Sequence, residues 1–192
     1  MIAFRIVAFA LPLASAFLAP ALLAWKPGWK AASIGHAALC APVLVAGLLA
    51  GASAGTILGV LLLSTAFAIL AAGLHLAAGQ VAAGLASCLL AASVLLAPRV
   101  VEEAIERNDA AAIRSRMDVL VAVSPWAVMA SSLFGLDILR DMPTLYRTHL
   151  ADYTDVHAPG WAKVAAWYTL SGVLLGTAAI AARRLRKRKN DS

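Results

Sequence analysis

The sequence predicts an all-α protein, a polytopic bundle of about six transmembrane helices with both termini in the cytoplasm. The first observation is that 68 consecutive residues between Lys30 and Arg99 include no Asp, Glu, Lys or Arg. As a helix this stretch is about 100 Å long, enough for about three crossings of a hydrocarbon layer about 30 Å thick. The second is a hydrophobic content of 62%, against about 45–50% in soluble domains. The third is that the apolar segments lack the alternating pattern of membrane β-barrels, which favours helices.

The predicted crossings form a single integral membrane domain that covers residues 1–192. Short turns of small residues at 51–55 and 77–79 and two longer polar segments separate the crossings. Ser124-Pro125 is expected to bend the fifth crossing, because proline removes a backbone donor and neighbouring side chains must cover the freed carbonyl. The crossings are expected at residues 6–25, 31–49, 56–76, 80–97, 119–136 and 161–182.

Positive charge orients these crossings, since cytoplasmic segments carry the excess of Lys and Arg. With the N-terminus inside, eleven of the sixteen basic residues are cytoplasmic, six of them in the basic tail 183–192. Trp25, Trp29 and Trp161 then lie near the outer interface, where indole rings are stable. The predicted location is the plasma (inner) membrane.

The N-terminal segment also resembles a secretory signal, with a small-residue Ala-Ser-Ala at 14–16. The apolar run continues to Trp25, which is long enough to span a membrane, so we expect an uncleaved first crossing. Cleavage after Ala16 would instead leave five crossings and an external N-terminus.

Two polar segments lie between crossings. In the cytoplasmic link 98–118, Glu103 is expected to pair with Arg107 on a short surface helix, and Asn108-Asp109 to end that helix and begin the next. The outer segment 140–160 is expected to form an amphipathic helix on the membrane surface, with Pro143 in its first turn. One face of that helix carries Tyr146, His149, Leu150, Tyr153 and His157.

Glycines recur at intervals of four residues, a spacing that lets helix backbones approach closely within lipid. We expect this spacing to serve packing within the chain, with residues 51–55 forming a turn. The alternative is an interface with other membrane proteins or with further copies of this chain. The glycines concerned are Gly47, Gly51, Gly55, Gly59, Gly172 and Gly176.

Histidines are the most informative polar residues, because an imidazole in lipid generally faces a partner, a cavity or a ligand. In the predicted topology all four lie toward the outer side, and His36 and His75 are candidate axial ligands of a b-type haem. A second hypothesis is a copper(I) or zinc site, to which thiols and imidazoles are suited. Its candidate ligands, besides those two histidines, are Cys40, Cys88, His149, Asp152 and His157.

The simpler interpretation of the same residues requires no cofactor, and it is the one we expect. Histidines near helix ends bond to water in the headgroup region, and membrane cysteines most often fill apolar space. No paired Cys-x-x-Cys is present.

No catalytic residues are predicted. Metalloprotease, P-loop and dinucleotide motifs do not occur, and Gly-x-Ser-x-Gly at 51–55 lacks the preceding strand that a nucleophile elbow requires. Charged residues do not occupy the middle of crossings two to six, which disfavours proton-coupled transport but leaves passage of neutral solutes open. The basic tail is expected to hold the last helix end in the cytoplasm, and nucleic-acid binding is not expected.

The sequence therefore favours a non-enzymatic multi-pass membrane protein, either a small transporter or an accessory subunit of a membrane complex. Its expected partners are the lipid bilayer and other membrane proteins. The first alternative is a membrane haem- or copper-binding protein. The second is a lipid-modifying enzyme at the outer face, with His149, Asp152, Asp155 and His157 as acid–base groups.

Overall fold

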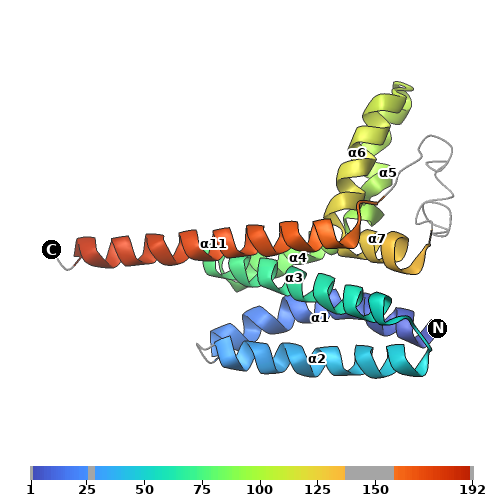
Figure 1. The fold of residues 1–192 in the computed structure, drawn as a ribbon. Coiled ribbons are helices and arrows are strands. Elements are labelled where there is room, and N and C mark those ends of the chain that lie inside the picture. The colour runs from blue at the N-terminus through green and yellow to red at the C-terminus, as the bar shows by residue number, and fades with distance from the viewer. Residues whose placement is uncertain (1, 26–28, 137–157, 191–192) are drawn as a thin grey trace. The chain divides into compact units, whose positions relative to one another are not determined.

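The computed structural model describes residues 2–25, 29–136 and 158–190, and this part of the chain is helical with no β-strand (Figure 1). The chain divides into two compact units. Unit 1 comprises Met1–Cys88 with Ala165–Ser192, and unit 2 comprises Leu89–Val164. The prediction of an all-α fold is confirmed for the described residues.

Unit 1 contains long apolar helices that match the first predicted crossings closely. They are α1 (Ile2–Trp25), α2 (Trp29–Leu49) and α3 (Ala54–Ala78), followed by most of α4 (Gln80–Ala91) and of α11 (Trp161–Asn190). The turns lie where small residues predicted them.

Two residues show why the chain turns there. Ser53 caps α3, because its hydroxyl accepts the Thr56 N–H at 3.1 Å. Gly79 ends the same helix with φ of 89°, a conformation that only glycine adopts without strain.

The core of unit 1 is built around α3. Val60, Leu63 and Phe67 on this helix are fully buried, and the Phe67 ring packs against Tyr168 of α11 with centroids 5.4 Å apart. A Cβ added to Gly73 would fall on the backbone carbonyl of Gly172, and one added to Gly172 would lie 2.5 Å from the Ile69 oxygen. The glycine of α11 therefore packs within the chain, as the spacing predicted.

The direction of α11 differs from the predicted alternation of crossings. Phe67 contacts Tyr168, Gly73 contacts Gly172, and further along the Arg183 Nη2 donates to the Leu76 carbonyl at 2.8 Å. Residue numbers rise together along both helices, so α3 and α11 run parallel (Figure 1). Six alternating crossings would make the third and the sixth antiparallel.

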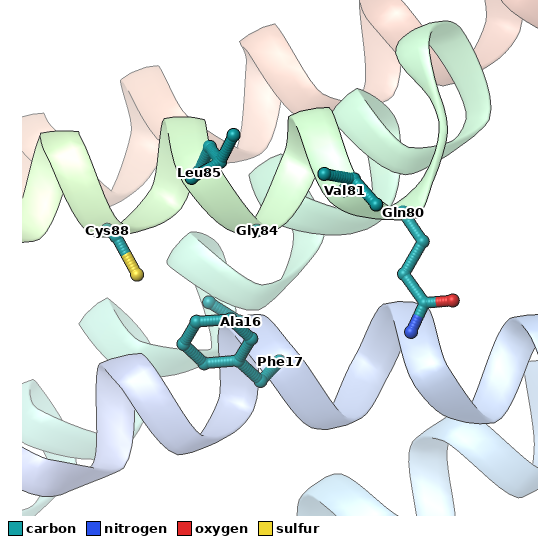
Figure 2. Close-up of a pocket in the computed structure, with 7 residues that line it drawn as sticks. All are labelled: Ala16, Phe17, Gln80, Val81, Gly84, Leu85 and Cys88. Atoms are coloured by element: carbon teal, nitrogen blue, oxygen red, sulfur yellow. The ribbon is translucent and has the colours of Figure 1, made fainter.

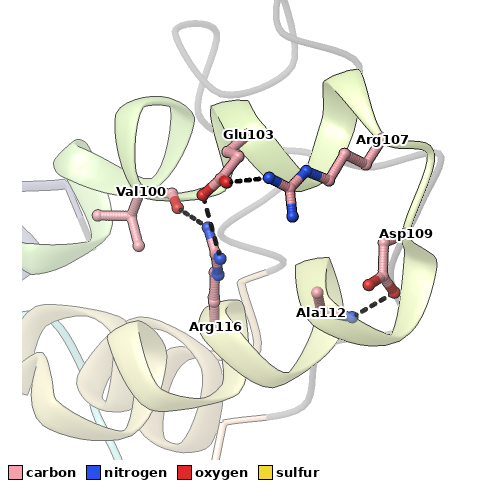
Figure 3. Close-up of polar contacts among 6 residues, drawn as sticks. All are labelled: Val100, Glu103, Arg107, Asp109, Ala112 and Arg116. Atoms are coloured by element: carbon pink, nitrogen blue, oxygen red, sulfur yellow. Dashed lines mark hydrogen bonds and ion pairs between the residues drawn. The ribbon is translucent and has the colours of Figure 1, made fainter.

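Unit 2 contains the point at which the predicted fourth crossing stops being an α-helix. After Ala91 the chain forms the 3₁₀ helix η1 (Ser93–Leu96), and α5 (Ala97–Glu106) and α6 (Ala110–Val123) follow. The predicted surface helix is confirmed, with Arg107 Nη2 2.7 Å from Glu103 Oε1. Its end at Asn108-Asp109 is confirmed as well, because Asn108 has φ of 52° and the Asp109 carboxylate accepts the Ala112 N–H (Figure 3).

The predicted fifth crossing is broken at Ser124-Pro125. There α6 ends, and the short α7 (Pro125–Val128) and the π-helical turn η2 (Met129–Leu133) follow. The bend is as predicted, but the freed Val121 carbonyl accepts the Ser124 N–H at 3.3 Å and so needs no neighbouring side chain. The Ser124 hydroxyl instead donates to the Ala91 carbonyl at 2.9 Å.

Within the described residues, two helices are long and apolar enough to cross a membrane, namely Ala54–Ala78 and Trp161–Lys189. Shorter apolar helical stretches cover Ile2–Phe17, Ser33–Leu49 and Gln80–Ala91. Most of the predicted outer amphipathic helix, including His149 and His157, falls at residues 137–157 and lies outside the described residues.

Candidate functional site

His36 is the centre of a polar cluster between α2 and α3. Its Nε2 lies 2.9 Å from the Thr65 Oγ1, and the Thr65 hydroxyl donates its one proton to the Leu61 carbonyl at 2.7 Å. Since that proton is already used, the hydrogen-bond network assigns the imidazole proton to Nε2, which donates to Thr65. The other ring nitrogen, Nδ1, is buried and has no hydrogen-bond partner among the described residues.

Cys40 completes this cluster from the next turn of α2. Its Sγ lies 3.5 Å from the His36 Nε2, as expected for residues four apart on one helix. A tetrahedral zinc or copper(I) ion, at about 2.3 Å from sulfur and about 2.0 Å from nitrogen, would hold such atoms about 3.5 Å apart. The spacing of the two atoms therefore fits a pair of metal ligands, but the His36 Nε2 that donates to Thr65 would first have to lose its proton.

The other predicted ligands of unit 1 lie elsewhere. His75 is ten residues beyond Thr65 on α3, about 15 Å along the helix axis, so the two imidazoles are not in contact in this structure. Cys88 lines a cavity beside α1. No three His, Cys, Asp or Glu side chains of the described residues gather closely enough to hold a metal ion.

A cavity of about 350 Å³ lies between α1 and α4 within unit 1 (Figure 2). Gly84 makes room for the Phe17 ring, since a Cβ added there would lie 3.3 Å from its Cε1 atom. Apart from the Gln80 amide and the Cys88 thiol, the walls are apolar. The lining residues are Ala16, Phe17, Gln80, Val81, Gly84, Leu85 and Cys88.

Three buried serines are polar groups that the sequence reasoning did not single out. Ser15 on α1, Ser64 on α3 and Ser87 on α4 are at most 1% exposed, and their hydroxyls have no hydrogen-bond partner in the part of the chain that the structure describes. A buried hydroxyl without a partner costs about 1–3 kcal/mol. Their signal in the sequence is weak, because a serine inside an apolar helix usually bonds to its own backbone.

The acid–base residues predicted for an outer-face enzyme, His149, Asp152, Asp155 and His157, lie outside the described residues. The haem, copper and enzyme interpretations thus stay predictions. No protein-family model, characterised protein or solved structure is significantly similar to this chain.

Proposed function

We propose that this protein is a multi-pass protein of the plasma (inner) membrane that acts without catalytic chemistry, as an accessory subunit of a membrane complex. The observation that carries the proposal is the inverted polarity of unit 1, which buries serine hydroxyls and exposes large apolar side chains. Lipid solvates such a surface, whereas water does not. The exposed apolar residues include Ile34, Leu44, Leu48, Leu49, Leu58, Leu62, Leu170, Val173 and Leu174.

The parallel direction of α3 and α11 favours five crossings over the six expected from hydropathy. Two crossings that run in the same direction must have an odd number of other crossings between them in the sequence. Between α3 and α11, α4 can be that one crossing. Residues 80–97 are apolar and helical. At about 1.5 Å per α-helical residue and about 2.0 Å per 3₁₀ residue they have a length of about 28 Å, close to the hydrocarbon thickness of about 30 Å. The simplest arrangement therefore uses α1, α2, α3, α4 and α11 and places the two termini on opposite sides.

The basic tail orients this arrangement. Five crossings divide the sixteen Lys and Arg residues evenly, eight to each side of the membrane, so the number of cations does not decide the orientation. Their spacing does, because orientation responds to cations close to helix ends, and long connecting segments translocate largely regardless of charge. Six cations follow directly on the apolar part of α11, which places that end in the cytoplasm and residue 1 outside.

Single cysteines test this topology in a variant in which Cys40 and Cys88 are replaced by serine. Gln80→Cys and Lys189→Cys are both at exposed positions. With five crossings, an impermeant maleimide should label both only after the cells are permeabilised. Six crossings would expose position 80 outside and position 189 inside, and that result would overturn the arrangement.

Close packing between α3 and α11 favours an accessory subunit over a solute carrier. The α3–α11 crossing is closed by backbone contact at Gly73 and Gly172, and the side chains of α3 around Leu63 are fully buried. In contrast, α11 leaves Trp167 51%, Leu170 59% and Leu174 59% exposed. This apolar face is suited to contact a helix of another membrane protein.

Photo-crosslinking in native membranes tests the accessory role. A photoreactive amino acid at position 170 or 174 should give adducts with a protein, and position 62, exposed on α3, is the matched control. Adducts with lipid alone at both α11 positions would contradict the accessory role.

The unpartnered hydroxyls of Ser15, Ser64 and Ser87 favour a second candidate, a small transporter for a neutral polar solute. Such hydroxyls would be satisfied by water or by a passing solute. In proteoliposomes this candidate predicts glycerol uptake that slows in Ser64→Ala. Uptake should be unchanged in the control Thr177→Ala, because this exposed hydroxyl bonds only to the backbone of its own helix. Uptake equal to that of protein-free vesicles would rule it out.

A further inference from the structure

Charge in unit 1 is concentrated at one end. Its sequence holds a single acidic residue, Asp191, but its α11 ends in six cations. The hydrogen bond from Arg183 to the Leu76 carbonyl sets the first of them at the level where α3 ends. Because α2 and α3 are antiparallel neighbours, α2 begins at the same end, where Lys30 is exposed.

The structure assigns a partner to this basic end, defined as Lys30, Arg183, Arg184, Arg186, Lys187, Arg188 and Lys189. We propose that it binds the phosphate headgroups of anionic phospholipids in one leaflet. The inference rests on the proposed membrane location. It adds a specific ligand chemistry, a preference for negatively charged over zwitterionic lipid.

The geometry of α11 fits a headgroup layer. The helix continues without a break to Asn190, and residues 183–189 are all exposed. Their length, about 10 Å, is close to the headgroup depth of about 5–8 Å on each side of the hydrocarbon. The consecutive positions distribute cations around the whole helix, so lipids on every side meet a guanidinium or an ammonium group.

Neighbouring apolar residues favour a lipid over a soluble polyanion. Ile180, one turn before Arg183, is exposed, and Leu185 within the basic segment is 67% exposed. A phospholipid can contact both the apolar side chains and the cations, because it carries an acyl chain beside a phosphate. The arginines of unit 2 differ, because Arg99, Arg107 and Arg116 face the carboxylates of Glu102 and Glu103.

Spin-labelled lipids measure this preference on the full chain in phosphatidylcholine vesicles. We expect the protein to associate with phosphatidylglycerol about fivefold more strongly than with phosphatidylcholine, the factor that about 1 kcal/mol gives. The ratio should approach one in 1 M salt, where the Debye length is about 3 Å. Arg184→Gln/Lys187→Gln/Arg188→Gln should lower the ratio at low salt, because it removes three of the seven cations of the basic end.

The matched control Arg99→Gln/Arg107→Gln/Arg114→Gln removes equal charge from unit 2 and should keep the preference. A ratio of one in the unchanged protein, or the same loss in both variants, would overturn the inference. Extraction of these vesicles with alkaline carbonate separates the two proposals. Protein that is released contradicts the membrane proposal itself, whereas protein that stays in the bilayer without the preference contradicts the lipid site alone.

Discussion

The two units join their helices in different ways. In unit 1, α3 contacts α11 through the backbones of Gly73 and Gly172. In unit 2, polar side chains make the contacts: the Arg116 guanidinium joins α5 to α6, and the Ser124 hydroxyl bonds at the break after α6. Arg116 donates to the Val100 carbonyl at 2.8 Å and lies 3.7 Å from the Glu103 carboxylate (Figure 3). Ser124 joins α6 to the end of α4 through the Ala91 carbonyl. The contact in unit 1 is of the kind that joins helices in lipid, as the proposed membrane location expects, whereas the ion pairs of unit 2 are exposed.

The largest expected effect comes from closing the glycine contact of unit 1. Gly172→Ala should destabilise the protein by about 3 kcal/mol, because the added methyl meets the Ile69 backbone, which cannot rotate away as a side chain can. Thermal unfolding in detergent measures the loss. Gly160→Ala is the control, since a Cβ there meets nothing within 4 Å. Equal stability of the two variants would show that α3 and α11 are not in backbone contact.

An intermediate effect is expected in unit 2 at the break between α6 and α7. Ser124→Ala should cost about 2 kcal/mol, because the Ala127 N–H loses its cap and the Ala91 carbonyl its donor. Hydrogen exchange of residues 119–128 should accelerate. Ser132→Ala is the control, since this exposed hydroxyl bonds only to the Val128 carbonyl of its own helix. Unchanged exchange in Ser124→Ala would contradict the assigned role.

The smallest effect is expected at the exposed carboxylate of unit 2. Glu103→Gln removes the charge that faces Arg107 and Arg116, and pairs this exposed contribute about 0.5 kcal/mol. The loss of stability should be measurable at low salt and vanish at 1 M salt. Glu106→Gln, at an exposed position on the same helix, should change nothing at either salt concentration. A loss that persists at high salt would mean that unit 2 is not bathed in water.

Sequence reasoning predicted the local features of both units from residues close together in the chain. The turn at Ser53, the helix end at Gly79, the Glu103–Arg107 pair and the break before Pro125 each depend on a few neighbouring side chains. The contact between His36 and Cys40 is of the same kind, because four residues make about one helical turn. Such features need no knowledge of the rest of the fold.

Partners distant in the sequence were not predictable in this way. Thr65 as the acceptor for His36, Gly73 as the partner of Gly172 and the separation of His75 from His36 depend on how whole helices pack. Hydropathy gives the length of a crossing but neither its neighbour nor its direction. The same apolar segments were therefore compatible with an α11 either parallel or antiparallel to α3.

The sequence by itself determined that the chain is helical, that its long neutral tract suits lipid, and where several of its turns and caps lie. Composition and short-range capping decide these, since each depends on a residue and its nearest neighbours. Only the tertiary structure decided that α11 runs parallel to α3 and that the Arg183 guanidinium meets the end of α3. Those choices follow from which small residues allow two backbones to touch, and that depends on both helices at once.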